Sequence, residues 1–182
     1  MDQARARQLL GEMLVCCFVI VLISGGFLAF FYTPSGEIIP YSGAYEPLRG
    51  VPMSAAYHSV LDMSFEEGTG LFVRRLHHSA SLLLGVGTAF WALLGRFRYA
   101  FAMLGLIIAG GIAGHGAADD LLSGTALGRV PIPLWYGLHL LLALAVGAAL
   151  VLSSRREAAR RPRTLPFTAL SIGLTLLAVF VL

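Results

Sequence analysis

The fold is decided by the stretch Gly70-Leu71-Phe72-Val73-Arg74-Arg75-Leu76-His77-His78-Ser79-Ala80-Ser81, which places two arginines and two histidines directly before an apolar segment, residues 82–94. Charged and imidazole side chains at the edge of a membrane span cost free energy, so they commonly mark a functional site. The stretch therefore indicates both where a membrane helix begins and where the site lies.

The composition is that of a membrane protein. Of the 182 residues, 57% are hydrophobic and 13% are charged, and the mean hydropathy is +0.79. All 13 basic residues are arginine, and the formal net charge of +3 is too small to indicate a nucleic-acid partner. The arginines gather at the ends of apolar segments, as membrane topology requires.

Five apolar segments approach the ~20 residues that a helix needs to cross a bilayer. They cover residues 12–32, 71–94, 99–117, 133–153 and 165–182. The first resembles a signal peptide, but it is long enough to span and no A-x-A cleavage site follows it. The last is short, which suits a tilted edge helix or one that leans on a partner subunit. We expect an all-α membrane protein with a single domain, residues 1–182.

The arginines also predict the orientation. Nine of them fall on one side of the alternating spans, which makes that side the cytoplasm. These nine are Arg5, Arg7, Arg96, Arg98, Arg155, Arg156, Arg160, Arg161 and Arg163. The opposite side holds seven of the ten acids. We expect a multi-pass protein of the bacterial inner (cytoplasmic) membrane with a cytoplasmic N-terminus and a C-terminus on the outer side.

The first outer loop begins with turn-forming residues and continues as a short amphipathic segment, residues 54–67. We expect the apolar face of this segment, with Val60 and Phe65, to lie on the membrane surface while Asp62 faces water. His58 is interpreted as a solvated surface residue. Cys16 and Cys17 lie in an apolar run and are interpreted as small hydrophobic residues. No C-x-x-C-H sequence encodes covalent haem attachment.

His77 and His139 form the candidate site. Each lies six or seven residues into a predicted helix, counted from the outer side, which is a depth of ~10 Å. Two imidazoles at one depth on different helices suit axial ligation of a haem iron from opposite faces. The alternative is a pair of buried histidines that are hydrogen-bonded to their neighbours.

Arg74 lies one helical turn outward from His77 on the same face, where its guanidinium can reach a haem propionate. Arg75 points elsewhere and can snorkel to lipid headgroups. Both arginines can also be plain interfacial anchors. Glycines on the surrounding helices let a flat macrocycle approach the backbone, although close helix packing is their commoner role in membranes. The glycines expected to pack against haem are Gly25, Gly26, Gly85 and Gly111.

Four stretches of the chain resemble motifs from the N-terminal half of cytochrome b, the membrane subunit of quinol:cytochrome c oxidoreductases. Residues 24–35 resemble the family's GxFLAxxYTPS segment, and residues 56–60 its AF-S-V element. Residues 70–78 resemble its GWLLRSLHHWGA motif, and residues 134–139 the start of its fourth helix. Order, spacing and topology agree over roughly residues 11–153.

The resemblance implies a transmembrane four-helix haem-binding bundle, followed here by a fifth C-terminal span. It implies that His77 and His139 hold the low-potential haem near the outer face and that Arg74 binds a propionate. The family places a second ligand pair 14 residues further along each helix, where this chain has Trp91 and Ser153. Because neither is a usual haem ligand, the resemblance implies one haem b rather than two.

Two further departures concern the quinone site. The family's GYVLPWG stretch at the end of the third helix is replaced by residues 110–116, which contain His115. The PEWY quinol-site motif belongs to the family's C-terminal half, which we expect further membrane subunits to supply. His115 and Asp119 form a candidate quinone or partner site. His115 can accept a quinol proton, contact a partner's cofactor, or cap a helix end.

The leading hypothesis is a mono-haem b-type cytochrome subunit that transfers electrons between a quinone and a redox partner on the periplasmic side. It is an electron-transfer subunit of a quinone-linked oxidoreductase complex rather than a stand-alone enzyme. The acidic outer loops suit docking of a periplasmic cytochrome c or iron–sulfur protein. The alternative is a haem-free membrane anchor or assembly subunit. A transporter is disfavoured, because the polar residues gather at one depth and no broken-helix pair recurs in two halves.

Overall fold

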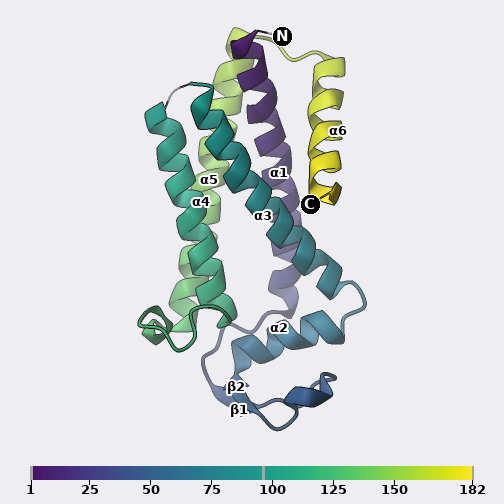
Figure 1. The fold of residues 1–182 in the computed structure, drawn as a ribbon, viewed down its shortest axis with the longest axis vertical. Helices are drawn as coiled ribbons and strands as arrows, with labels where there is room; N and C mark the ends of the chain where they lie inside the picture. The colour runs from purple at the N-terminus through teal and green to yellow at the C-terminus, as the bar shows by residue number, and fades with distance from the viewer. Residues whose placement is uncertain (1, 96, 182) are drawn as a thin grey trace.

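The computed structural model describes residues 2–95 and 97–181, and these residues form an almost entirely helical protein (Figure 1). The helices are α1 (Gln3–Phe31), α2 (Ala55–Phe65), α3 (Gly70–Leu93), α4 (Phe97–Ala118), α5 (Ile132–Arg160) and α6 (Leu165–Val181). Two short strands, β1 (Ile38–Pro40) and β2 (Pro52–Ser54), and two 3-10 turns, η1 (Glu46–Leu48) and η2 (Leu127–Arg129), occupy the connections.

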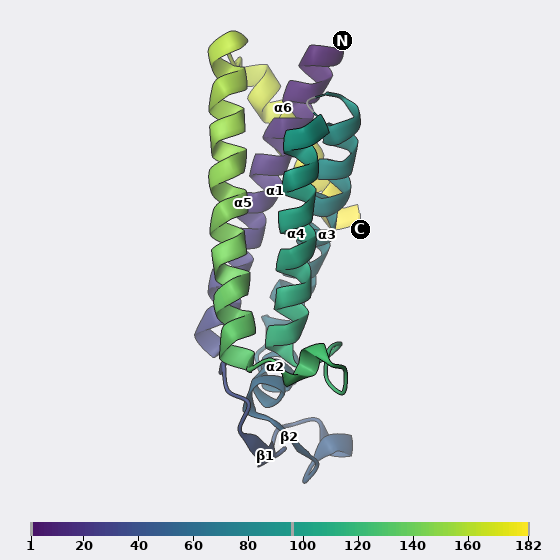
Figure 2. The same ribbon diagram turned by 90° about the vertical axis from the view of Figure 1, so that its left-hand side faces the viewer.

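Four long helices form the bundle that the sequence predicts. The pairs α1–α3, α3–α4, α4–α5 and α5–α1 are each in contact, so the four helices close a ring. Helix α6 packs against α1 on the outside of this ring and ends beside its middle (Figures 1 and 2). The prediction of an all-α membrane protein is confirmed.

The bundle surface is apolar, as lipid contact requires. Large side chains such as Ile23, Phe30 and Leu144 are 69%, 90% and 67% exposed, more apolar surface than a water-soluble protein shows. By length and composition, α1, α4 and α5 can each cross a membrane. Helix α3 is 24 residues long but carries two arginines and two histidines, and α6 has 17 residues. These two remain predicted spans.

The first outer loop has more structure than its turn-rich sequence predicts. Strands β1 and β2 pair antiparallel, with Ile39 opposite Met53, and Ser54 caps α2 by accepting a hydrogen bond from the Tyr57 amide at 3.2 Å. Helix α2 confirms the predicted amphipathic segment, but its Val60 is 6% exposed and packs inside the protein. Phe65, at 49% exposed, stacks on Tyr45.

The interpretation of His58 as solvated surface is wrong. Its side chain is 14% exposed and Nδ1 lies 2.7 Å from Asp62 Oδ2. The ring also packs 4.9 Å from the ring of Tyr41. Asp62, which was expected to face water, is partly buried by the same contacts. His58 therefore ties α2 to the loop that precedes β2 through Tyr41, a residue that the linear sequence does not mark as its neighbour.

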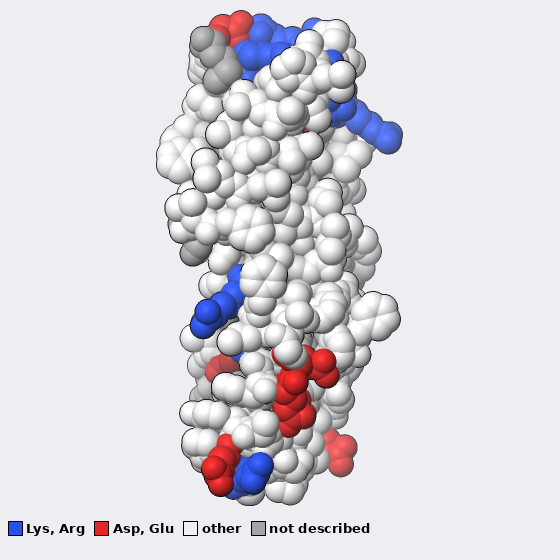
Figure 3. Space-filling view, turned by 90° about the vertical axis from the view of Figure 1, so that its right-hand side faces the viewer, with Lys and Arg blue, Asp and Glu red and all other residues white. Residues whose placement is uncertain are grey.

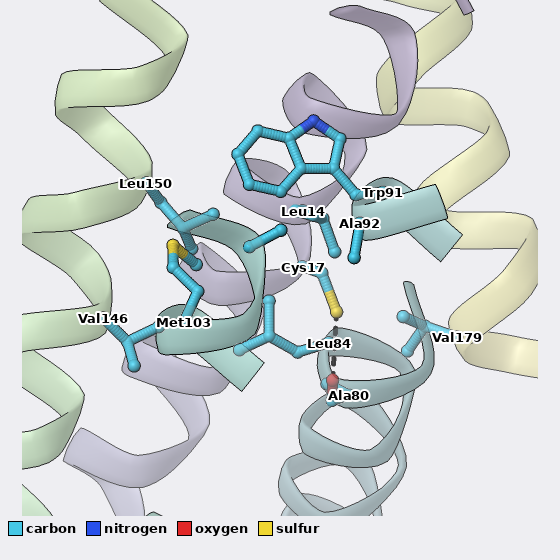
Figure 4. Close-up of a cluster of buried hydrophobic side chains, with 11 residues drawn as sticks. Leu14, Cys17, Ala80, Leu84, Trp91, Ala92, Met103, Val146, Leu150 and Val179 are labelled. Atoms are coloured by element: carbon cyan, nitrogen blue, oxygen red, sulfur yellow. Dashed lines mark hydrogen bonds between the residues drawn. The ribbon is translucent and has the colours of Figure 1, made fainter. Parts of the chain in front are cut away.

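The best-packed part of the bundle is the half nearer the N-terminus of α1. Residues from five helices fill it (Figure 4). Among them, Leu14, Trp91 and Met103 are 2%, 3% and 1% exposed. The interpretation of Cys17 as a small hydrophobic residue is confirmed, since it is buried, free of any disulfide, and donates only a weak hydrogen bond to the Ala80 carbonyl at 3.0 Å.

Charge is distributed unequally between the two ends of the bundle. Basic side chains gather at the end where α1 begins, and acidic side chains dominate the other end on the face shown in Figure 3. Three ion pairs tie the first end together: Arg7 with Glu157, Arg161 with Asp2, and Arg163 with Glu12. The asymmetry follows the arginine bias of the sequence and supplies the polar caps between which the apolar bundle lies.

Candidate functional site

The structure brings His77 and His139 together across the bundle. Each is the eighth residue of its helix, α3 and α5, and these helices face each other across the ring. Their ring centroids lie 6.2 Å apart with an interplanar angle of 62°. The two side chains therefore reach the same depth, as counting from the helix starts predicts. Their role as metal ligands stays a prediction.

Both imidazoles contact a backbone carbonyl of the neighbouring helix, and His77 has a further partner, because Ser24 Oγ lies 3.1 Å from its Nδ1. Nδ1 of His77 lies 3.1 Å from the Val21 carbonyl oxygen of α1, and Nδ1 of His139 lies 2.8 Å from the Gly110 carbonyl oxygen of α4. A carbonyl only accepts, so Nδ1 carries the proton in each ring and donates it. The second nitrogen, Nε2, is then the unprotonated one and is available to a metal.

A glycine faces each ring from the same neighbouring helix. A Cβ at Gly25 would lie 3.0 Å from Cε1 of His77, and a Cβ at Gly114 would lie 3.1 Å from Cε1 of His139. Each glycine follows the carbonyl that binds the ring by four residues, so one helical turn supplies both the acceptor and the space. The pairing of a carbonyl with a glycine four residues later thus occurs twice, once on α1 and once on α4, although only α1 adds a serine, Ser24, beside its histidine.

The predicted set of packing glycines matches this arrangement in part. Gly25 contacts His77, whereas a Cβ at Gly85 would meet Ile107 at 3.6 Å, and Gly26 and Gly111 face open space. Gly114 was not in the predicted set. The four-residue spacing between Gly110 and Gly114 is visible in the sequence. Only the structure, however, shows that this turn of α4 contacts His139.

Arg74 lies next to the pair and is held by two side chains. Its Nη1 donates to Ser64 Oγ at 3.1 Å, and its Nη2 lies 3.8 Å from Asp120 Oδ2. Ser64 belongs to α2, and Asp120 follows α4. The guanidinium of Arg74 therefore connects α3 to α2 and to the end of α4. The sequence predicted the position of Arg74 relative to His77 but not these partners.

His115 has a carboxylate partner, Asp120, the neighbour of the Asp119 that was placed with His115 in the candidate quinone or partner site. Nδ1 of His115 lies 3.0 Å from Asp120 Oδ1. Asp119 instead adopts a left-handed backbone conformation with φ of 53°, which ends α4 and turns the chain. His78, left without a role by the sequence, packs against His115 with ring centroids 6.2 Å apart.

The two positions at which the resemblance places a second ligand pair lie in different surroundings. Trp91 is 3% exposed and belongs to the packed core at the basic end of the bundle. Ser153 lines a separate small cavity near the end of α5. Neither side chain forms a counterpart of the histidine pair.

Comparison with known proteins identifies the relatives of this chain. No family model matches it. The cytochrome b subunit of the cytochrome bc1 complex of Mycobacterium tuberculosis is 37% identical over 183 aligned positions, which cover 79% of this chain and 33% of the relative. The corresponding subunits of Corynebacterium efficiens and Streptomyces coelicolor are 41% and 37% identical over 131 positions, 65% of this chain and 24% of each relative.

The chain thus spans about a third of the length of the curated relatives that it matches. The match falls on their N-terminal part, which agrees with the motifs found from residue 24 to residue 139. This chain is a homologue of the N-terminal part of the cytochrome b subunit of bc1 complexes.

Proposed function

We propose that this chain is a mono-haem b-type cytochrome subunit of a membrane redox complex, which transfers electrons between a quinone and a redox partner on the periplasmic side. The relatives are named as cytochrome b subunits of bc1 complexes, and the proposal extends a redox role of that kind to this shorter chain. The observation that carries it is the pair of imidazoles held across the bundle by matching backbone acceptors.

The residues present fit a haem iron. Two imidazoles that shared one metal ion, at metal–nitrogen distances of about 2 Å, would have ring centroids about 6 Å apart. The observed separation of His77 and His139 is 6.2 Å. In the described ranges, 2–95 and 97–181, no group of three or more His, Cys, Asp and Glu side chains is placed to hold a metal ion. The protein ligands that the proposal offers are the two imidazoles alone.

The proposal assigns one haem to the chain. The half of the bundle nearer the basic end is a close-packed core, with Leu14, Trp91 and Met103 almost fully buried (Figure 4). A second macrocycle there would have to displace these side chains, and it would find Trp91 and Ser153 where the ligands should be. His77 and His139 are not among the residues of this cluster, which reaches only as far as their neighbours Leu76 and Val21.

The mechanism assigns a task to each residue of the site. When bound, the haem supplies one-electron chemistry, and the chain supplies its ligands and surroundings. His77 and His139 offer Nε2 because their Nδ1 protons are donated to Val21 and Gly110. Arg74, fixed by Ser64 and Asp120, presents a guanidinium one helical turn outward, where a propionate would be neutralised.

His115 and Asp120 provide a proton acceptor at the same end of the bundle. A quinol that loses electrons must also lose protons, and a neutral imidazole accepts a proton near neutral pH. Asp120 accepts the Nδ1–H of His115, orients the ring, and stabilises the imidazolium that forms. The quinone chemistry in this proposal takes place near the outer face, next to Arg74.

The chain is proposed to work with partner subunits and in one orientation in the membrane. Its relatives are named as subunits of a complex, and we infer that this chain also works with further membrane subunits. The arginine-rich end faces the cytoplasm of a bacterial inner membrane by the positive-inside rule. The acidic outer end faces the periplasm, where a cytochrome c or an iron–sulfur protein can dock.

The test is haem stoichiometry in the full chain purified in detergent. We expect one haem per chain and a b-type band in the reduced-minus-oxidised spectrum. His77→Ala and His139→Ala should each abolish the band, because the proposed site needs both imidazoles to hold the haem, while Trp91→Phe should keep it. Absence of any band in the wild type would support the haem-free anchor, and two haems per chain would overturn the assignment of a packed, haem-free half.

A further inference from the structure

A small cavity lies at the basic end of the bundle, between the start of α4 and the end of α5. Tyr99, Ser153, Arg156, Glu157 and Arg160 line it. Four of these residues come from one face of α5, since positions 153, 156, 157 and 160 repeat at the three- and four-residue spacing of a helix. The first turn of α4 contributes Tyr99.

Ion pairing leaves two of the lining arginines with unneutralised charge. The three acids at this end are each paired to another arginine: Glu157 to Arg7 at 2.5 Å, Asp2 to Arg161 at 2.9 Å, and Glu12 to Arg163 at 2.9 Å. Within the described part of the chain, no ion pair includes Arg156 or Arg160. The cavity therefore carries a net positive charge although Glu157 forms part of its wall.

Neutral groups of the cavity add donors and rigidity. Tyr99 donates its hydroxyl to the Ala149 carbonyl oxygen at 2.7 Å, which fixes the ring against α5, and Trp91 packs edge-on against it at 6.1 Å between centroids. Ser153 contributes a hydroxyl. The first turn of α4 is the positive end of its helix dipole, which favours an anion at this point.

The cavity lies where the apolar bundle surface gives way to charge. Val151 and Leu152, just before it on α5, are 42% and 53% exposed and apolar. The segment from Arg155 to Arg163 that follows holds five arginines. A membrane protein meets the phospholipid phosphates at this boundary, and basic pockets between helices on the cytoplasmic side bind anionic headgroups.

We propose that this cavity binds the phosphate of an anionic phospholipid, with Arg156 and Arg160 as the charged donors and Ser153 as a neutral one. The site is independent of the histidine pair and does not require haem. Ser153 lines the proposed lipid site, and Trp91 packs against Tyr99 in its wall. These two residues stand at the positions of the family's second ligand pair, so in this chain the same positions would serve lipid binding.

The experiment titrates the purified full chain in detergent with phosphatidylglycerol or phosphatidylcholine and counts bound lipids by native mass spectrometry. We expect selective retention of phosphatidylglycerol. Arg156→Gln and Arg160→Gln should each weaken retention about tenfold, because each removes a charge-assisted hydrogen bond to phosphate. Arg155→Gln is the matched control: it removes the same charge from the adjacent, exposed position, outside the cavity, and should leave retention unchanged.

Three outcomes would overturn the proposal. Equal retention of phosphatidylcholine would mean that the charge of the headgroup is not recognised. An equal loss in Arg155→Gln would mean that only the general charge of this end matters. Displacement of the lipid by millimolar inorganic phosphate would identify free phosphate as the ligand. Arg156→Lys, which keeps the charge, should restore part of the binding and excludes a folding defect as the cause of the loss.

Discussion

At the scale of single residues, the site depends on two glycines as much as on two histidines. Each imidazole lies in a groove that a backbone carbonyl and a glycine four residues later form on one helical turn. If the glycine gains a side chain, the ring must move a few tenths of an ångström away, because the new Cβ would lie 3.0 Å or 3.1 Å from Cε1. The tautomer that leaves Nε2 available therefore depends on Gly25 and Gly114.

We expect Gly114→Ala to weaken haem retention about tenfold, the usual cost of disturbing a group that orients a metal ligand. The added methyl pushes the His139 ring away from the Gly110 carbonyl. The band height per chain in the reduced-minus-oxidised spectrum measures the effect after gel filtration. Gly105→Ala, on the same helix with no atom within 4 Å of the new Cβ, is the control. Equal haem content in the two variants would contradict the groove mechanism.

Some partners in the site were not predictable from the sequence. Arg74 and Asp120 are 46 positions apart, and nothing in either stretch marks the other as its partner. Asp119 and Asp120 look alike in sequence, but only Asp120 reaches His115, because the chain turns at Asp119 as α4 ends. Depth counting worked for His77 and His139 because both helices begin at recognisable signals and run in the same direction.

At the scale of elements, the hairpin and α2 form a unit whose stability responds to pH through Asp62. Partial burial raises the pKa of Asp62 above its usual 3.8, although the nearby His58 acts in the opposite direction. The folded unit then binds the Asp62 proton more tightly than the unfolded chain does. Its contribution to stability is therefore greatest below pH 3.8 and is lost as the pH rises through the raised pKa.

We expect hydrogen exchange of the α2 amides, corrected for the intrinsic effect of pH on exchange, to show less protection as the pH rises from about 4 towards neutrality. Asp62→Asn removes the titrating group and should flatten this dependence. Glu46→Gln changes an exposed carboxylate of the same loop and serves as the control. An unchanged profile in Asp62→Asn would assign the pH response to another group.

The long helices were predictable, while the small outer unit was not. Runs of apolar residues between arginines define α1, α4 and α5 almost alone, because a helix in lipid must satisfy its own backbone. The strands β1 and β2 have three residues each. This is too short for an alternation of apolar and polar residues to be recognised in the sequence. Their pairing depends on contacts such as Tyr41 with His58, which no local pattern encodes.

At the scale of the whole molecule, the bundle is divided into two unlike halves. The half farther from the N-terminus holds the histidine pair, Arg74 and His115, while the other half is filled by Trp91, Met103 and their neighbours. A closed ring of four helices leaves both halves equally able to enclose a cofactor. The difference between the two halves arises from their side chains alone.

This division predicts which side of the membrane exchanges electrons with the haem. In sealed right-side-out vesicles, we expect the membrane-impermeant oxidant ferricyanide to oxidise the reduced haem rapidly, because His77 and His139 lie near the outer end. In inside-out vesicles the packed half separates the oxidant from the haem, and oxidation should be much slower. Stopped-flow recording of the b-type band measures both rates, and detergent should make them equal. Faster oxidation in inside-out vesicles would contradict the proposed orientation, and equal rates would mean that electrons cross the packed half.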